Sequence, residues 1–220
     1  MIRLNAEYLK TYFEMIKKLN SMQDKEYMEA FLSYNTSLIC AGVKPAITLT
    51  LMIINGRNLY DLWIKYGKVY IDELNLSYKV LRQNKNSLTL IIYDYKVLND
   101  CLNKECNIEF LKTLGYRENE DLSSKLTRLS KRYSMCKCPH ELGIFLGYPV
   151  EDVQSFMNSK NKQCKICGYW KVYNSEKKAE KIFALFDKVR NCVAENIIKG
   201  SSRVQLVKKL RGEVKLFMNY

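Results

Sequence analysis

The three prolines of this chain lie in two places, and they limit where helices can begin and end. The residue before a proline is disfavoured in the α region, so Pro45 predicts that helical structure ends near Lys44. Proline is favoured in the first turn of a helix, so Pro139 and Pro149, at the two ends of the run Pro-His-Glu-Leu-Gly-Ile-Phe-Leu-Gly-Tyr-Pro, each predict the start of a brief helix. The same run contains His140, the only histidine. The rarest residue types are therefore gathered in short segments, and we look for function there.

Composition predicts one folded, soluble domain. The chain has 220 residues, of which 47% are hydrophobic and 27% are charged, which is enough apolar material for a full core and argues against disorder. The N-terminus lacks the apolar core of a signal peptide, and the longest apolar run, at 46–54, is far shorter than a membrane span. Eight cysteines without a secretory signal favour free thiols in a reducing compartment. We therefore expect a cytoplasmic protein without a membrane partner.

The formal net charge of +13 and the pI near 9.3 allow two interpretations. A strongly basic balance is typical of proteins with a nucleic-acid partner, and the densest cationic cluster includes Lys208, Lys209 and Arg211 near the C-terminus. Abundant Lys, Asn, Ile and Tyr are also typical of AT-rich genomes, in which a positive charge says little about partners. We favour the second interpretation.

Helical spacing, β-branched runs and turn residues together predict an α+β fold. The pattern indicates helices at 5–19, 24–33, 58–66, 95–103, 107–114, 121–134 and 175–199, two brief helices within 139–157, and strands at 46–53, 76–82, 87–93 and 168–173. The expected sheet is small and mostly antiparallel, in a split β-α-β-β-α-β order with a helical insertion and flanking N- and C-terminal helices. We expect one domain over residues 1–200 and a basic helix over 201–220 that packs on it or extends from it.

Residues that commonly begin, cap or end helices account for most of the segment 139–149. Pro139 suits a helix start, Glu141 is placed to reach back toward the cap, and Gly147 is placed to end the helix in the left-handed conformation. His140 is the one residue type that this interpretation does not require. It is therefore the first candidate for a functional role in the segment.

The apolar spacing of residues 141–156 also fits a helix-turn-helix motif. The second helix of that motif would meet DNA by its N-terminal residues, which here are Glu151 and Asp152. Two carboxylates at that point oppose binding, because phosphate contacts dominate the affinity for DNA. A nucleic-acid-associated protein therefore stays an alternative function, not the leading one.

Five side chains that can bind a metal ion lie in two short segments: Cys136, Cys138, His140, Cys164 and Cys167. Cys-x-x-Cys is the usual chelating spacing for tetrahedral zinc, so Cys138, His140, Cys164 and Cys167 are a candidate zinc site, with a thiol redox site as a related alternative. Cys136-x-Cys138 is not a common zinc spacing. A set of small, buried or half-exposed thiols is the simpler interpretation.

Alternation in Gly-Tyr-Trp-Lys-Val-Tyr predicts a strand with two different faces. Tyr169, Lys171 and Tyr173 share one face, and Trp170 and Val172 share the other, which we expect to enter the core. A Tyr-Lys-Tyr face can stack on a planar ligand while the lysine meets an anion. An amphipathic edge strand explains the same pattern, and both interpretations stay open.

The segments 40–46, 139–153 and 168–173 together resemble a bacterial family, domain of unknown function 3793, found largely in anaerobic Gram-positive bacteria. The resemblance extends over nearly the whole chain to about Gly200 and implies no established activity, cofactor or partner. It implies that members tend to share Lys44, Pro45, His140, Glu141, Gly147, Tyr148, Pro149, Glu151, Asp152, Tyr169, Trp170, Lys171 and Tyr173. Cys136 and Cys138 are not part of the family pattern, which weakens the zinc hypothesis.

The leading functional hypothesis is a non-catalytic binding protein with one cleft for an anionic or planar small ligand or a partner segment. The candidate ligand-binding residues are Lys44, His140, Glu141, Tyr169, Lys171 and Tyr173. No catalytic residue is predicted, because nothing in the sequence places a cysteine opposite the only histidine. The hypothesis requires that the lysine, the Pro-His-Glu segment and the tyrosine-rich strand converge on one concavity.

Overall fold

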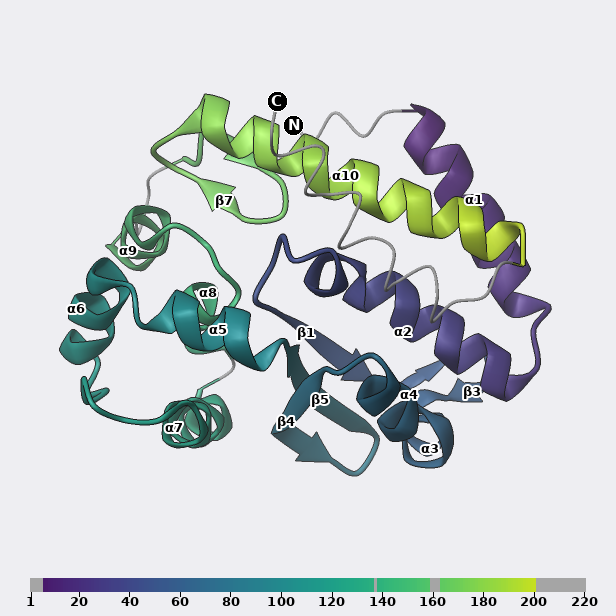
Figure 1. Ribbon diagram of the computed structural model, residues 1–220, viewed down its shortest axis with the longest axis horizontal. Coiled ribbons are helices and arrows are strands. Elements are labelled where there is room, and N and C mark those ends of the chain that lie inside the picture. Colours follow the sequence, from purple (N-terminus) through teal and green to yellow (C-terminus); the bar gives the residue numbers. More distant parts are fainter. Residues whose placement is uncertain (1–5, 137, 159–162, 201–220) are drawn as a thin grey trace.

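A computed structural model describes residues 6–136, 138–158 and 163–200 of the chain (Figure 1). Helices make up most of it: α1 (Ala6–Asn20), α2 (Asp24–Cys40), α3 (Leu59–Leu62), α4 (Lys68–Glu73), α5 (Tyr95–Leu102), α6 (Glu105–Thr113), α7 (Leu122–Met135), α8 (Leu142–Phe145), α9 (Val150–Asn158), α10 (Glu176–Ile198), and a π-helical turn, η1 (Trp63–Gly67). The strands are β1 (Ala46–Leu51), β2 (Ile53–Ile54), β3 (Arg57–Asn58), β4 (Ser77–Asn84), β5 (Ser87–Tyr93), β6 (Ile166–Cys167) and β7 (Lys171–Val172). The α+β prediction is confirmed.

The central sheet has three antiparallel strands in the order β1-β5-β4. Strand β1 pairs with β5 from Ala46↔Tyr93 to Leu51↔Leu88, and β4 and β5 form the predicted hairpin. The predicted split β-α-β-β-α-β arrangement is wrong for the described residues, because β7 pairs with β6 in a separate two-stranded sheet. The motif Gly-Tyr-Trp-Lys-Val-Tyr supplies only a two-residue strand, too short to extend the central sheet.

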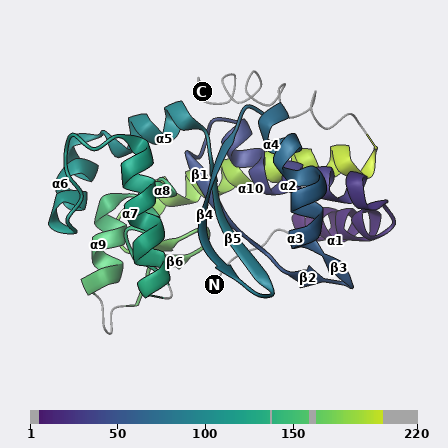
Figure 2. The ribbon, with the colours of Figure 1, turned by 90° about the horizontal axis from the view of Figure 1, so that it is seen from below.

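The two faces of the central sheet bury two different hydrophobic cores. Successive side chains of a strand point to opposite faces, and in β5 Leu90 and Ile92 belong to one core while Ile91 and Tyr93 belong to the other. The first core contains residues from α1, α2, α3, α4 and α10, and the second contains residues from α5 through α9. Figure 2 shows the strands between these two groups of helices. The ring of Tyr148 packs against both cores and so lies where they meet.

Helix α10 connects distant parts of the chain. It begins beside the β6–β7 hairpin and lies along α1 and α2 (Figure 1). Its buried side chains, which include Phe186 and Val193, complete the first core. The sequence predicted this helix at 175–199, close to its observed bounds.

Helix α2 is longer than the sequence predicted, because hydroxyl side chains near its end are satisfied inside the helix. Thr36 donates to the carbonyl of Leu32, and Ser37 donates to the carbonyl of Tyr34. These bonds let polar residues be buried without breaking the helix. Gly42, with φ of 75°, then follows the end of the helix in the left-handed conformation. The basic helix predicted for 201–220 lies outside the described residues.

Candidate functional site

Lys44 lies in the loop that joins α2 to β1, against the turn that joins α8 to α9. The backbone N–H groups of Val43 and Lys44 both donate to the carbonyl of Leu38, which fixes the loop on the end of α2. Gly147 has φ of 77°, and a Cβ atom there would lie 2.7 Å from Cδ of Pro45. The segment of Pro45 and the segment from Pro139 to Pro149 are therefore in direct contact, and glycine is required at position 147 where they meet.

The ammonium of Lys44 is buried among aromatic rings. The residue is 7% exposed, and its Nζ lies 5.0 Å from the centre of the Tyr148 ring and 5.9 Å from that of Phe186. The described residues offer its side chain no hydrogen bond and no ion pair. Burial, assisted by the charge of Arg190, lowers the pKa of Lys44 to about 8. The amine is still mostly protonated at neutral pH.

Arg190, on α10, is a second cation in the same place. Its guanidinium lies 5.1 Å from the centre of the Tyr169 ring and 5.5 Å from that of Tyr34, and its Nε is buried without a hydrogen-bond partner. Burial raises the pKa of both tyrosines, so the phenols stay neutral and give no counter-charge. We call this group the Lys44–Arg190 cluster; it consists of Lys44, Arg190, Tyr34, Tyr148, Tyr169 and Phe186.

Among the described residues, Asp187 is the carboxylate that contacts a member of the cluster, and it is already engaged. The hydroxyl of Tyr169 donates to Oδ1 of Asp187 at 2.8 Å. Asp187 forms no ion pair with Lys44 or Arg190 among the described residues. Two cations and one carboxylate leave a net positive charge in a largely buried group.

The β6–β7 hairpin supplies one wall of the cluster. Trp170 stacks on Tyr148, with ring centres 5.3 Å apart, and meets Phe183 edge-on at 4.6 Å. A Cβ atom at Gly168 would collide with the Phe183 ring, so this backbone lies directly on α10. The ring of Tyr169 packs edge-on against Phe186 at 4.9 Å. The predicted entry of Trp170 into the core is observed, while Tyr169 reaches the cluster from the same hairpin.

Asp152 holds this hairpin in place. It is 4% exposed and accepts hydrogen bonds from Nε1 of Trp170 (2.9 Å), from the backbone N–H groups of Tyr173 (2.9 Å) and Asn174 (3.0 Å), and from the Asn174 side chain (2.9 Å). Asp152 at the start of α9 is therefore turned toward the hairpin and buried there, while Glu151 beside it is exposed. The helix-turn-helix hypothesis needs both residues at an exposed recognition end. Lys208, Lys209 and Arg211, on which the nucleic-acid hypothesis also depends, lie outside the described residues.

Glu141 is fully buried in a different part of the molecule. Its carboxylate pairs with the Arg132 guanidinium and accepts a hydrogen bond of 3.3 Å from the hydroxyl of Tyr116. The prediction that Glu141 reaches back to cap its own helix is wrong, because the side chain has these stronger partners on α7 and after α6. We assign Glu141 to the attachment of α7 to α8, away from the Lys44–Arg190 cluster.

His140 and Lys171 share one exposed aromatic ring. The His140 ring lies 5.1 Å from the ring of Phe156, and Nζ of Lys171 lies 5.3 Å from the centre of the same ring. Among the described residues, neither side chain shares a hydrogen bond, ion pair or ring contact with Lys44. Tyr173, which the alternating pattern placed on the same face as Lys171, is 5% exposed, whereas Lys171 is exposed. Of the six candidate residues, Lys44 and Tyr169 therefore meet in one cluster, His140 and Lys171 meet in another place, and Glu141 and Tyr173 are buried elsewhere.

The proposed zinc ligands do not assemble into a metal site. Among the residues that the structure describes, no group of three or more His, Cys, Asp or Glu side chains is placed to hold a metal ion. Cys164 and Cys167 do lie together, with their Sγ atoms 3.2 Å apart. Cys138 is exposed, and the His140 ring is packed on Phe156.

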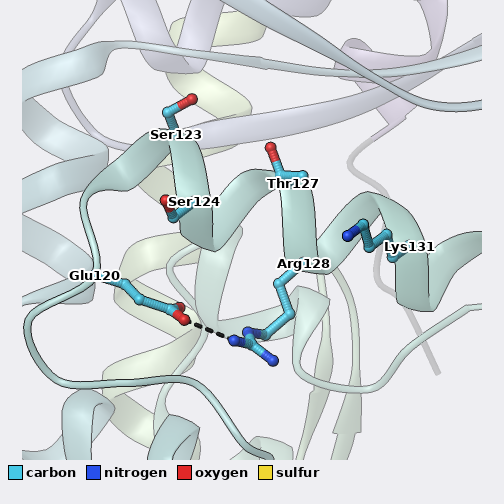
Figure 3. A pocket seen from close by; sticks show the side chains of 6 residues that line it. All are labelled: Glu120, Ser123, Ser124, Thr127, Arg128 and Lys131. Atoms are coloured by element: carbon cyan, nitrogen blue, oxygen red, sulfur yellow. Dashed lines mark hydrogen bonds and ion pairs between the residues drawn. The ribbon is translucent and has the colours of Figure 1, made fainter.

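Two surface pockets lie where no sequence pattern predicted a site. One, of about 280 Å³, is lined by Glu120, Ser123, Ser124, Thr127, Arg128 and Lys131 on the outer side of α7 (Figure 3). Figure 3 shows Glu120 and Arg128 turned toward each other, and they form an ion pair of 2.6 Å, while Lys131 is a third charged residue of the lining. The other, of about 220 Å³, lies between α9, the hairpin and α10, and Asp152, Trp170 and Lys178 are among its lining residues. In the first pocket the ion pair neutralises two of the three charges, and the charge of Lys131 is left over.

Sequence reasoning missed Arg190, Tyr34 and Phe186. Each lies on a long amphipathic helix, where an aromatic or basic residue at helical spacing looks like ordinary core or surface. The only part of the cluster that a sequence motif marked, besides Lys44 and Tyr169, was Tyr148 in the run Gly-Tyr-Pro. The residues that surround Tyr148 in space come from three other segments of the chain.

No helix among the described residues has the length and apolar character that a membrane crossing requires.

Comparison with known proteins identifies a family and no individual relative. A family model described as "Protein of unknown function (DUF3793)" matches residues 32–207, which include the loop of Lys44, the α8–α9 turn, the β6–β7 hairpin and α10. Searches of curated proteins and of solved structures each found no significant match. The matched range contains every residue of the Lys44–Arg190 cluster and most of the chain, and the chain belongs to the DUF3793 family.

Proposed function

We propose that this protein binds a small anionic ligand at the Lys44–Arg190 cluster. The observation that carries the proposal is the buried ammonium of Lys44, which has aromatic neighbours and a second cation nearby but no acidic partner among the described residues. Buried charges in folded proteins are normally paired, because removal from water costs several kcal/mol per ion. A bound carboxylate, sulfate or phosphate group would supply the missing partner.

The arrangement of the two cations suits such a ligand. Lys44 comes from the α2–β1 loop and Arg190 from α10, so an anion between them would bridge two elements that are distant in the sequence. Arginine presents several donors in a planar fork, and the buried Nε of Arg190 is one donor that is still unused. Lysine adds a point charge. Together they would fix both the position and the orientation of an anionic group.

The aromatic rings add a preference for a planar body on the ligand. Tyr148 and Phe186 border the ammonium, and Tyr169 borders the guanidinium. Aromatic faces pack well against flat, apolar groups. An aromatic carboxylate therefore combines the charge and the shape that the cluster favours, and we infer tighter binding of benzoate than of acetate.

Tryptophan fluorescence tests this proposal directly. Trp170 stacks on Tyr148, which covers Lys44, so occupancy of the cluster should change its emission. Trp63 is the only other tryptophan, and the Trp63→Phe variant isolates the signal of Trp170. We expect saturable changes with benzoate, and weaker ones with sulfate and acetate, at constant ionic strength.

Two cluster variants and one matched control decide the outcome. Lys44→Met and Arg190→Met should remove the saturable signal, while Lys171→Met, which removes an exposed lysine from the same hairpin, should leave it unchanged. A titration that shows no saturation with any of the three anions, or the same saturation in the Lys44→Met protein, rules out the site.

A further inference from the structure

Two cysteines before and within β6 form a close dithiol. The Sγ atoms of Cys164 and Cys167 are 3.2 Å apart, both residues are partly buried, and both are free thiols. A disulfide requires the two sulfur atoms to approach to about 2.05 Å, so closure needs a movement of only about 1 Å. The other six cysteines also form no disulfide. Among the described residues, Cys164 and Cys167 are the pair with a hydrogen bond between their two sulfur atoms.

The backbone of the β6–β7 hairpin imposes this proximity. Cys167 pairs with Lys171 in the register of the hairpin, the N–H of Lys165 donates to the carbonyl of Val172 at 2.8 Å, and the N–H of Gly168 donates to the carbonyl of Trp170 at 3.1 Å. The far side of the hairpin is fixed by the hydrogen bonds to Asp152. The thiols are thus held together before any bond forms, which favours an intramolecular reaction over reaction with a second molecule.

We infer that Cys164 and Cys167 are a reversible thiol–disulfide site that reacts with low-molecular-weight disulfides. The inference rests on the geometry of the hairpin and does not depend on the proposed anion site. The dithiol lies within a few residues of Tyr169 and Trp170, so its closure would also tighten the hairpin that borders the Lys44–Arg190 cluster.

The chemistry proceeds in two exchange steps and balances without any further reactant. The thiolate of Cys164 attacks one sulfur of a disulfide RSSR, which forms a mixed disulfide and releases RS⁻. Cys167 then loses its proton and attacks Sγ of Cys164, which closes the protein disulfide and expels the second RS⁻. The two protons from the protein thiols convert both products to RSH. The sum is protein dithiol plus RSSR giving protein disulfide plus two RSH.

The contact between the two sulfur atoms allows either cysteine to begin the exchange, because either atom could be the donor. Interaction with Cys164 and burial raise the pKa of the Cys167 thiol, against a smaller lowering by the charge of Lys171. The exchange balances with Cys164 as the attacking sulfur, and it balances equally with the two roles reversed.

Mass spectrometry of the full-length protein in glutathione buffers tests the inference. After equilibration, free thiols are blocked by alkylation and the peptide that contains both cysteines is analysed. We expect it to lose two hydrogens at a ratio of reduced to oxidised glutathione that leaves the other six cysteines alkylated, and to regain them with dithiothreitol. Cys164→Ser and Cys167→Ser should each abolish the loss, and the Cys167→Ser protein should instead retain a glutathione adduct on Cys164.

Three results would overturn the inference. The first is that Cys164 and Cys167 are no more oxidised than the other cysteines across the series of buffers. The second is that wild-type protein accumulates a stable glutathione adduct at Cys164 without forming the protein disulfide. The third is that purified protein contains stoichiometric zinc that blocks alkylation of both thiols, which would assign the pair to a metal instead. Circular dichroism of the two serine variants checks that their fold is unchanged.

Discussion

The ammonium of Lys44 lies 5.0 Å from the centre of the Tyr148 ring, and this contact joins the α2–β1 loop to the α8–α9 turn. Tyr148 packs against both hydrophobic cores, so the buried charge lies at the junction between the two halves of the molecule. A residue kept only for stability would not be a lysine at such a place, because an apolar side chain of similar length avoids the cost of burying the charge.

Replacement of Lys44 by methionine should therefore stabilise the protein. Its pKa is lowered from 10.5 to about 8, which corresponds to a cost of about 3 kcal/mol at neutral pH, partly offset by about 1 kcal/mol from its contacts with aromatic rings. We expect Lys44→Met to raise the free energy of unfolding by about 1–3 kcal/mol at pH 7 in urea denaturation.

Lys125→Met is the matched control for that substitution. Lys125 is also buried, at 3% exposed, but its Nζ donates to Oδ1 of Asn103 at 2.9 Å. Loss of this hydrogen bond should offset the relief of burial, so we expect no gain in stability. A Lys44→Met protein that is less stable than wild type would show that the charge is structural.

The gain from Lys44→Met should depend on pH in a defined direction. The pKa of Lys44 is lower in the folded state, so between about pH 8 and 10.5 the unfolded chain binds a proton that the folded chain has released. Wild-type stability therefore rises relative to the variant across this window, by at most about 1.4 kcal/mol per pH unit. Urea denaturation of both proteins at several pH values from 7 to 10.5 should show the difference shrink; a constant difference contradicts the shifted pKa.

Removal of the Asp152 carboxylate should release the β6–β7 hairpin. Asp152→Ala leaves the indole N–H of Trp170 and two backbone N–H groups without their acceptor, and we expect a loss of about 2–4 kcal/mol in the free energy of unfolding. Glu151→Ala, which removes an exposed carboxylate from the same turn of α9, should change stability by less than about 0.5 kcal/mol. Equal losses of unfolding free energy in the two variants would show that the Asp152 carboxylate does not hold the hairpin.

A methyl group at Gly168 should push the hairpin off α10. Because a Cβ atom there collides with the Phe183 ring, we expect Gly168→Ala to cost about 1–3 kcal/mol of stability, measured by thermal unfolding. Phe183→Leu should cost less in the Gly168→Ala background than in wild type, since the smaller side chain makes room. Additive effects of the two substitutions would show that the collision is relieved in another way.

Local sequence patterns predicted local structure, but they did not predict which distant segments meet. Turn residues and hydrophobic spacing were enough to place the β4–β5 hairpin and α10, because these patterns are set by neighbours in the chain. The pairing of β7 with β6, and the attachment of Glu141 to Arg132, depend on which distant segments meet, and no local pattern encodes that. Lys44 was one of the predicted ligand-binding residues, and that role stays a prediction. Its neighbour Arg190 lies in an ordinary helical pattern and became visible only in three dimensions.

The most direct test of the account is the pH dependence of benzoate binding, measured by calorimetry at constant ionic strength. Benzoate keeps one negative charge from pH 6 to 10, so any change reports on the protein. If Lys44 holds the anion, the affinity should be constant at low pH and fall by up to about tenfold per pH unit once the pH exceeds the pKa of Lys44, about 8 in the free protein. The Lys44→Met protein should bind no benzoate at any pH. An affinity that stays flat to pH 10, or that survives in the variant, would contradict the claim that the buried lysine is an anion-binding group.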